Sequence, residues 1–188
     1  MYRKHSIIQN KEFSTDTYDK VLIESLRKYF TLPHPVKGKY VKLVFTNNRK
    51  NIEPNTAKTG DIEKNIICIS NFEINKTPGE DLIDDITASS YDTAGVPSEC
   101  INHNLKTHWH TKYRNGHVAK FPHEVVLSLK NSTLINNVSL ITRQEPPMNG
   151  QPHDFVLWIA DDITFRPGAI SAIFRLRVNE INNCLEQR

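Results

Sequence analysis

The sequence predicts an all-β protein, an antiparallel β-sandwich of the jelly-roll kind with a C-terminal helix. Two observations support this prediction. Short runs of alternating apolar and polar residues recur along the chain, and each is bounded by Pro, Gly or Asn. Ten prolines and seven glycines among 188 residues favour a loop-rich β protein, and 38% hydrophobic residues suffice for one domain core.

The first half of the chain contains one predicted helix and two predicted strands. Residues 18–30 place apolar side chains at helical spacing, which predicts a helix. Residues 38–46 alternate apolar and polar side chains with β-branched and aromatic members, so we expect a strand. A polar segment over 47–65 predicts a loop, and residues 66–74 form the second strand.

The second half contains three more predicted strands, at residues 124–129, 137–143 and 154–160, each next to Pro, Asn or Gly. Such short strands separated by turns are typical of an antiparallel sandwich. Residues 170–185 again carry apolar side chains at helical spacing, which predicts the C-terminal helix.

Composition argues against several classes of protein. The net charge of +3 is scattered, and no basic stripe alternates with aromatic residues, so we expect no nucleic-acid partner. No apolar run is long enough to span a membrane, and residues 1–10 lack the apolar core of an export signal. The three cysteines, Cys68, Cys100 and Cys184, form no CxxC pair, and we expect buried free thiols.

Residues 107–154 are rich in aromatic side chains and fixed hydrogen-bond donors. Trp109, His110, Tyr113, Arg143 and Asn149 all fall in this stretch, close to turn residues. A sugar ring stacks its C–H face on an aromatic ring while polar side chains bind its hydroxyl groups. This pattern therefore favours a binding module over an enzyme, and no nucleophile–base pair or catalytic signature is present.

Several ordered motifs resemble a known family. They lie at residues 86–90 (Ile-Thr-Ala-Ser-Ser), 101–104, 107–113 (Thr-His-Trp-His-Thr-Lys-Tyr), 121–123 (Phe-Pro-His), 142–144 and 149–150 (Asn-Gly). In this order they resemble the discoidin family, the coagulation factor 5/8 type C domain, and within it the family 32 carbohydrate-binding modules. The resemblance covers roughly residues 81–162 and implies a galactose-binding-like sandwich.

The order of the segments differs from that family. Residues 1–77 resemble the C-terminal part of a discoidin domain, through strands 37–46 and 66–74, whereas 78–162 resemble its N-terminal and central part. The chain is either cut from a tandem array or a circularly permuted domain. Because half a sandwich exposes an apolar face and unpaired edges, we expect 36–74 and 122–160 to share one core. Residues 163–188 match no part of the family and remain an unassigned tail.

The resemblance implies a ligand-binding role for Arg143, His110, Asn149, His123 and Tyr113. Arg143 would donate hydrogen bonds to sugar hydroxyls, with an ion pair to Glu145 or Asp154 as the alternative. His123 has an equally plausible structural role. Adjacent strand residues point to opposite faces, and the family buries the Trp109 position, so we expect His110 to be exposed. Tyr113 is a candidate stacking ring, and Asn149 alternatively serves only the turn.

The resemblance also implies a structural calcium ion in the loop that contains Asn102, Asn104 and Thr107. Asn102 stands where the family has Asp, and Asn71 stands at the position of a Glu in the closing strand. Because calcium prefers carboxylate ligands, we expect at most a weak site. His103, His108, His110 and His117 match no established zinc spacing, so we expect them to be solvated.

The sequence therefore predicts a non-catalytic carbohydrate-binding module for galactose-like or N-acetylated sugars. The resemblance implies an accessory module of a secreted or cell-surface glycan-active protein. Its partners would be a glycan and further domains of a larger protein, without membrane insertion, and its location extracellular. Two alternatives stay open, a module for protein or phospholipid adhesion and a rearranged discoidin domain without a working site.

Overall fold

The alternating segments form nine antiparallel strands. The computed structural model describes residues 27–52, 61–75, 77–102, 104–114, 117–144, 149–178 and 185–187. The strands are β1 (Arg27–Asn48), β2 (Cys68–Ile74), β3 (Thr77–Pro78), β4 (Ile83–Ala88), β5 (Trp109–His110), β6 (His123–Thr142), β7 (Pro152–Ala160), β8 (Ile170–Val178) and β9 (Leu185–Gln187). Short helical turns are α2 (Arg49–Ile52), α3 (Asp61–Asn65), α4 (Gly79–Leu82) and η1 (Pro97–Cys100). Within these ranges no helix is long and apolar enough to cross a membrane.

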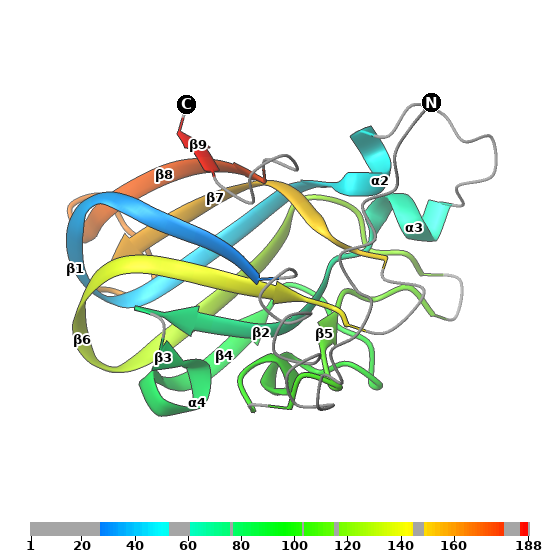
Figure 1. Ribbon diagram of the computed structural model, residues 1–188, viewed down its shortest axis with the longest axis horizontal. Coiled ribbons are helices and arrows are strands. Elements are labelled where there is room, and N and C mark those ends of the chain that lie inside the picture. The colour runs from blue at the N-terminus through cyan, green and yellow to red at the C-terminus, as the bar shows by residue number, and fades with distance from the viewer. Residues whose placement is uncertain are drawn as a thin grey trace, which may run out of the picture.

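Two long strands turn one hydrogen-bonded sheet into two layers. β1 has 22 residues and β6 has 20, and they pair with each other along most of their length. Figure 1 shows both strands turning over at the left edge of the molecule. The first layer contains β4, the first half of β6, the second half of β1, β7, β8 and β9. The second contains the other halves of β1 and β6, with β2, β3 and β5. The predicted antiparallel sandwich is confirmed.

The bends coincide with breaks in the pairing register. β1 changes register between Thr31 and Val36, where Pro33 and Pro35 stand. Proline has no N–H to donate to a ladder, so these two residues fit a point where pairing is interrupted. Gly38 follows the bend and lies against the first layer, where a Cβ would overlap the Ile159 side chain. Only glycine allows this close approach.

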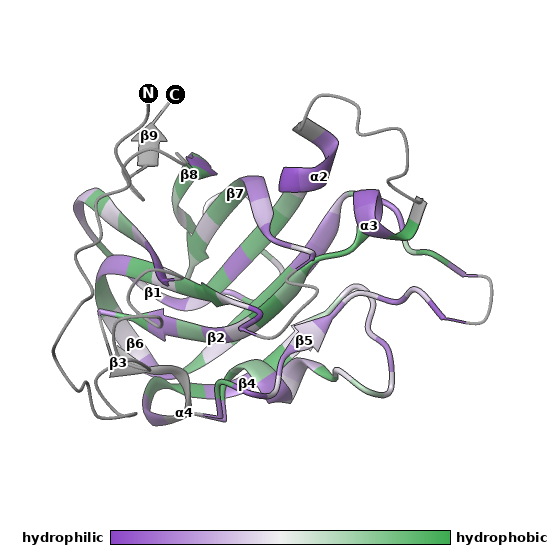
Figure 2. Cartoon of the chain, turned by 45° about the vertical axis from the view of Figure 1, so that its right-hand side comes forward, coloured by the Kyte–Doolittle hydropathy of each residue, from purple (hydrophilic) through white to green (hydrophobic). Residues whose placement is uncertain are grey.

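The core lies between the layers and joins both parts of the chain. Figure 2 shows hydrophobic residues alternating with hydrophilic ones along the strands, as one buried face requires. Phe30 of the second layer meets Phe155 of the first edge to face, with ring centroids 4.8 Å apart. Phe45 of the first layer lies 6.2 Å from Trp109 of the second. All four belong to one hydrophobic cluster.

The stretches 36–74 and 122–160, which we expected to share a core, pair directly. Tyr40 to Phe45 of β1 lie opposite Ser128 to His123 of β6, and β2 pairs with the end of β6. The same part of β1 pairs with β7 on its other side. Whether this arrangement arose by circular permutation stays a prediction.

The predicted C-terminal helix is wrong in the described residues. Residues 170–178 form β8, paired antiparallel with β7. Leu176 and Val178 are buried and alternate with Arg175 and Arg177, whereas Ile173 is 48% exposed. The period of two fits this burial, and β8 covers an edge of β7 that would otherwise have unpaired backbone N–H and C=O groups. The rest of the predicted helix, 179–185, lies outside the described residues except for the start of β9.

The other differences concern element boundaries. The predicted helix over 18–30 is a strand where it is described, because Arg27 to Phe30 begin β1. The strands predicted at 124–129 and 137–143 are two halves of the bent β6. The predicted loop over 47–65 contains α2 and α3, and the fully buried Asn48 stabilises their approach. Its Nδ2 donates to the carbonyls of Glu63 and Ile66, both at 2.9 Å.

Candidate functional site

Three of the predicted ligand-binding residues converge on Cys68, the first residue of β2. β5 pairs with β2 so that His110 stands opposite Cys68. The backbone N–H of Cys68 donates to the carbonyl of Gly150 at 2.8 Å, which brings Asn149 to the same place. β2 pairs on its other side with β6, and Arg143 follows the last residue of that strand. We call Arg143, His110, Tyr113 and Asn149 the Cys68 cluster.

The positive charge of Arg143 acts on both Cys68 and His110. Burial raises the pKa of the Cys68 thiol to about 12, and the positive charge of Arg143 partly opposes that rise. The same charge contributes to lowering the pKa of His110, where burial is the largest cause. Cys68 is therefore a neutral thiol at pH 7, and Arg143 is the principal charge beside it.

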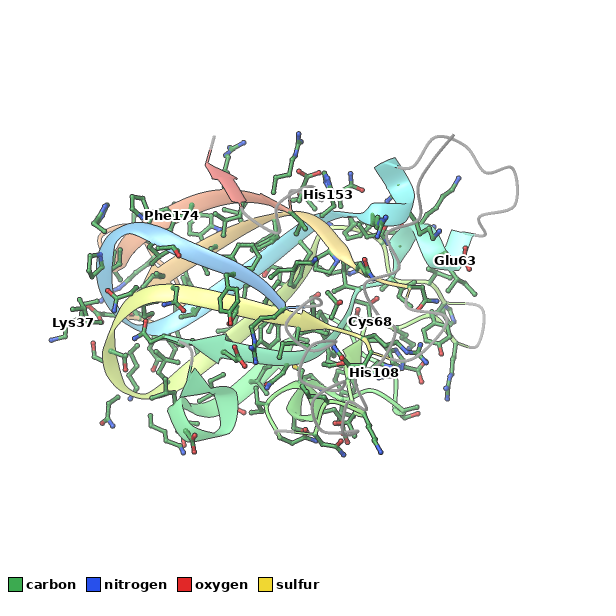
Figure 3. All side chains as sticks on the ribbon, viewed as in Figure 1. Lys37, Glu63, Cys68, His108, His153 and Phe174 are labelled. Carbon is green, nitrogen blue, oxygen red and sulfur yellow. The ribbon has the colours of Figure 1, made fainter. Side chains whose placement is uncertain are left out.

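The cluster includes a row of rings. The His110 ring centroid lies 5.0 Å from that of Tyr113 and 5.5 Å from that of His108. Figure 3 labels Cys68 and His108, which lie in the same region of that view. Tyr113 and His108 are half-buried, so each presents part of its ring to solvent. Arg114 lies over the Tyr113 ring, 5.7 Å from its centroid.

The expected exposure of His110 is wrong. His110 is only 4% exposed, and Trp109 is fully buried. Both are buried because a turn packs on the outer side of β5, where the Gly95 carbonyl accepts the backbone N–H of His110 at 3.1 Å. His110 Nδ1 lies 3.2 Å from the Thr111 carbonyl, which can only accept, so Nδ1 carries the proton. Nε2 remains as a hydrogen-bond acceptor.

Two charged residues that were not among the predicted site residues, Asp92 and Arg114, adjoin this cluster. Asp92 is 6% exposed, and its carboxylate lies 3.6 Å from Nε of Arg114. Its charge also acts on His110, where it raises the pKa against the stronger effect of burial. Tyr91, next in sequence, is 49% exposed. Tyr91 and Asp92 directly follow the Ala-Ser-Ser motif, and this position was the sequence signal that could have identified them.

Asn149 contributes an acceptor to the cluster. Its Oδ1 is buried and has no hydrogen-bond partner among the described residues. Such an atom is costly unless a partner arrives from outside. Gly150 beside it has a φ of +72°, and a Cβ there would lie 2.8 Å from the Cys68 sulfur. The Asn-Gly pair thus serves the turn and delivers a polar atom to the cluster.

His123 has a structural environment away from these residues. Its Nε2 donates to the carbonyl of Asn65 at 2.6 Å, and its ring lies 4.6 Å from that of Phe121. Burial lowers its pKa, so the ring is neutral at pH 7. In the described part of the chain no contact joins it to the Cys68 cluster.

The alternative role expected for Arg143 was an ion pair with Glu145 or Asp154. Asp154 instead binds Arg177 and His153, and Glu145 lies outside the described residues.

The predicted calcium ligands gather around one hydroxyl group. Thr107 Oγ1 has three acceptor oxygens within reach, the carbonyls of Glu99 (3.0 Å) and Asn104 (2.9 Å) and Oδ1 of Asn102 (3.1 Å). A hydroxyl has one hydrogen and donates to one of them. The remaining oxygens form a donor set that suits a hard cation such as Ca²⁺.

The charge available to such an ion is low. The Glu99 carboxylate lies 3.2 Å from Nδ2 of Asn102 and is thus the acid in contact with a predicted ligand residue. Asn71, predicted to stand for the closing glutamate, is 5% exposed, and its Oδ1 has no partner in the described structure. No group of three His, Cys, Asp or Glu side chains arranged for a metal occurs within the described ranges. The loop residues fit calcium by ligand type rather than by charge.

No protein-family model matches the chain, and no curated protein matches it. The discoidin resemblance therefore stays a prediction carried by the quoted motifs.

Chemically, the Cys68 cluster offers a guanidinium, a neutral imidazole, an amide and a partly exposed phenol ring. These groups can bind hydroxyl-rich ligands, and both cysteines described, Cys68 and Cys100, are buried free thiols as expected.

Proposed function

We propose that this chain binds carbohydrate without catalysis, through the Cys68 cluster, and that its ligands are galactose-like or N-acetylated sugars. The observation that supports this proposal most is the convergence of Arg143, His110 and Asn149 on Cys68 from three separate segments. A donor, an acceptor and an amide beside a half-buried aromatic ring are the groups that a shallow sugar site needs. The motifs that resemble discoidin domains supply the same residues.

Each residue has a distinct role in the proposal. Arg143 donates charge-assisted hydrogen bonds to ring hydroxyls, which are about twice as strong as neutral ones. Asn149 is half-buried and offers its side-chain amide for a hydrogen bond with a ring hydroxyl. Tyr113 offers the ring on which the C–H face of the sugar stacks. His110 is largely buried and orients Tyr113 through their ring contact.

The proposed site is small, so weak binding by a single module is expected. Ordering the side chains and the sugar offsets much of the contact energy. Further modules in a larger protein would raise the overall affinity through multivalency. We infer that the chain serves as an accessory module of a secreted or cell-surface glycan-active protein, as in the family it resembles.

Calorimetric titration against D-galactose, N-acetylgalactosamine, N-acetylglucosamine and D-glucose tests this proposal. We expect one of the first three to bind, and Arg143→Ala to weaken binding by about tenfold or more, the equivalent of one charged hydrogen bond. Arg166→Ala is the matched control, because Arg166 is exposed in the β7–β8 loop and its ion pair is a local one, with Asp162 at 3.0 Å. Flat heats for all four sugars, or equal losses in both variants, would contradict the proposal.

A second proposal concerns calcium in the loop that contains Asn102, Asn104 and Thr107. The crowding of oxygens around the Thr107 hydroxyl favours it. Bound calcium would brace the loop that leads into β5 and so support His110 and Tyr113. If calcium binds the native state, added Ca²⁺ raises Tm and a chelator lowers it.

Thermal unfolding with and without millimolar CaCl₂ is the measurement. We expect the Ca²⁺ effect to disappear in Thr107→Val, which removes the central oxygen while keeping the side-chain shape. Mg²⁺ serves as the control ion, since it demands a smaller octahedral site. An unchanged Tm in CaCl₂ would overturn the calcium proposal and leave the sugar proposal to its own test.

A further inference from the structure

A pocket lies on the outer face of the first layer, away from the Cys68 cluster. It has a volume of about 430 Å³ and lies over β1, β7 and β8. Figure 3 labels His153 at the beginning of β7, next to this pocket in sequence and apart from Cys68 and His108. The volume falls in the range of small-molecule sites in proteins.

Strand register explains why polar residues gather there. Asn47, Asp154 and Arg177 stand opposite one another on β1, β7 and β8, and Val156 and Arg175 form the next cross-strand row. Residues paired in this way project on the same face of a sheet. The inward residues of β7 and β8 alternate with them and fill the core. The outer row is therefore left to face the pocket.

Asp154 is engaged by its neighbours and fixes their positions. Its Oδ1 accepts from Nε of Arg177 at 2.7 Å, and its Oδ2 lies 2.8 Å from Nδ1 of His153. The Thr46 hydroxyl donates to the Asp154 backbone carbonyl at 3.1 Å. Partial burial opposes the change, but the hydrogen bonds from Arg177 and His153 lower the pKa of the Asp154 carboxyl. This carboxylate thus orients Arg177 across the pocket.

Arg175 adds a charge that nothing in the pocket balances. It lines the pocket with Arg177, two residues further along the same strand. Its side chain makes no hydrogen bond or ion pair with the described parts of the chain. The lining therefore contains two guanidinium groups and one carboxylate, a local excess of one positive charge. Guanidinium groups bind carboxylates through two parallel N–H···O bonds.

We propose that this pocket binds a carboxylate-bearing saccharide of the uronic acid type. Arg175 takes the carboxylate, and Thr46 and Asn47 provide polar groups for ring hydroxyls. The lining offers Val156 as its outward apolar side chain, which favours a hydroxylated ligand over an apolar one. β7 is paired on both sides, so a peptide cannot add to it as a further strand. The site is independent of the Cys68 cluster.

Titration of ¹⁵N-labelled protein with D-galacturonate, followed by NMR, tests the proposal. We expect the amides of Asn47, Val156 and Arg175 to shift, and those beside Cys68 to stay in place. Arg175→Gln should weaken this binding by about tenfold or more, since it removes a charged hydrogen-bond pair from an exposed position. Arg143→Ala should leave it unchanged, which separates this site from the sugar site proposed above.

Two further ligands decide the chemistry. Neutral D-galactose should leave the β7–β8 amides unmoved, because it lacks the carboxylate. Acetate supplies the carboxylate without the ring and should bind more weakly than D-galacturonate. The proposal is overturned if galacturonate moves none of these amides, if Arg175→Gln binds as wild type does, or if galactose or acetate binds there as tightly as galacturonate.

Discussion

The ring pair Phe30–Phe155 gives a direct test of the sandwich, because it joins the two layers and the two parts of the chain. Phe30 lies on the first half of β1 and Phe155 on β7, and their exposed fractions are 1% and 2%. Changing each residue to Leu, separately and together, removes the ring contact while keeping most of the buried volume. A double-mutant cycle then isolates the energy of the pair.

The expected magnitude follows from the geometry. The centroids are 4.8 Å apart and the ring planes are inclined by 84°, an edge-to-face contact of the favoured kind. Such pairs contribute about 0.5–1.5 kcal/mol beyond the buried area. Each single Phe→Leu change should cost up to about 1.5 kcal/mol, as volume-conserving core changes do. The double variant should therefore lose about 0.5–1.5 kcal/mol less than the sum of the two single losses.

Urea unfolding of the four proteins, followed by tryptophan fluorescence, measures these free energies. Ile86→Val on β4 provides the control partner for Phe30→Leu, because Ile86 is buried in the same cluster but is aliphatic and cannot form a ring pair with Phe30. That control pair should be additive within about 0.3–0.5 kcal/mol. If the Phe30–Phe155 coupling is no larger than the control, the two layers do not pack through this contact and the reasoning fails.

Three further results are expected. Gly95→Ala should cost about 1–3 kcal/mol and abolish sugar binding, because the new Cβ would overlap the His110 ring and lie 2.9 Å from the His108 carbonyl; unchanged urea and sugar titrations would contradict this. Burial lowers the pKa of His110 and His123, so the stability tied to their neutral forms is complete above the ordinary value of 6.5 and is lost as pH falls through their folded-state pKa. The urea midpoint should therefore be lower at pH 5 than at pH 7.5, and this difference should be smaller in His123→Gln. The same pH difference in the wild type and in His123→Gln would refute the assignment to His123. Asn48→Ala should lower the free energy of unfolding by about 1–3 kcal/mol, because it removes the donor from the buried Ile66 carbonyl and from the part-buried Glu63 carbonyl. A loss within the error of urea unfolding would show that water replaces the amide.

Strands with a strict period of two could be read from the sequence, whereas long-range pairing could not. Residues 38–46 alternate clearly and lie in β1, whereas residues 66–74 begin with an apolar run, and Cys68 to Ile74 of this segment form the fully buried β2. The segment 170–178 carries two patterns at once, since Ile170, Ile173 and Phe174 suggest a helix while Leu176 and Val178 alternate. The edge of β7 decides between them by offering a ladder of hydrogen bonds. That edge is set by tertiary structure and leaves no local signal.

The composition of the candidate site was easier to predict than the exposure of its members. Arg143 and Asn149 follow a strand end and a turn, so their place at a sheet end could be inferred from local signals. The burial of His110 depends on the turn that brings Gly95 against β5, which is distant in sequence. Asp92 reaches the cluster through the same turn. The outer pocket depends on the register of three strands, which the sequence does not reveal.

Because β1 and β6 each run through both layers, neither layer can lose its backbone ladder alone. When β2 separates from the end of β6, the rest of β6 is destabilised as well. That rest of β6 pairs with β4 and with the second half of β1. Amide protons in β2 and in β7 should then exchange with solvent deuterium through one shared opening event. The slowest-exchanging amides of β2 and β7 should report the same free energy of opening, although the two strands belong to different layers.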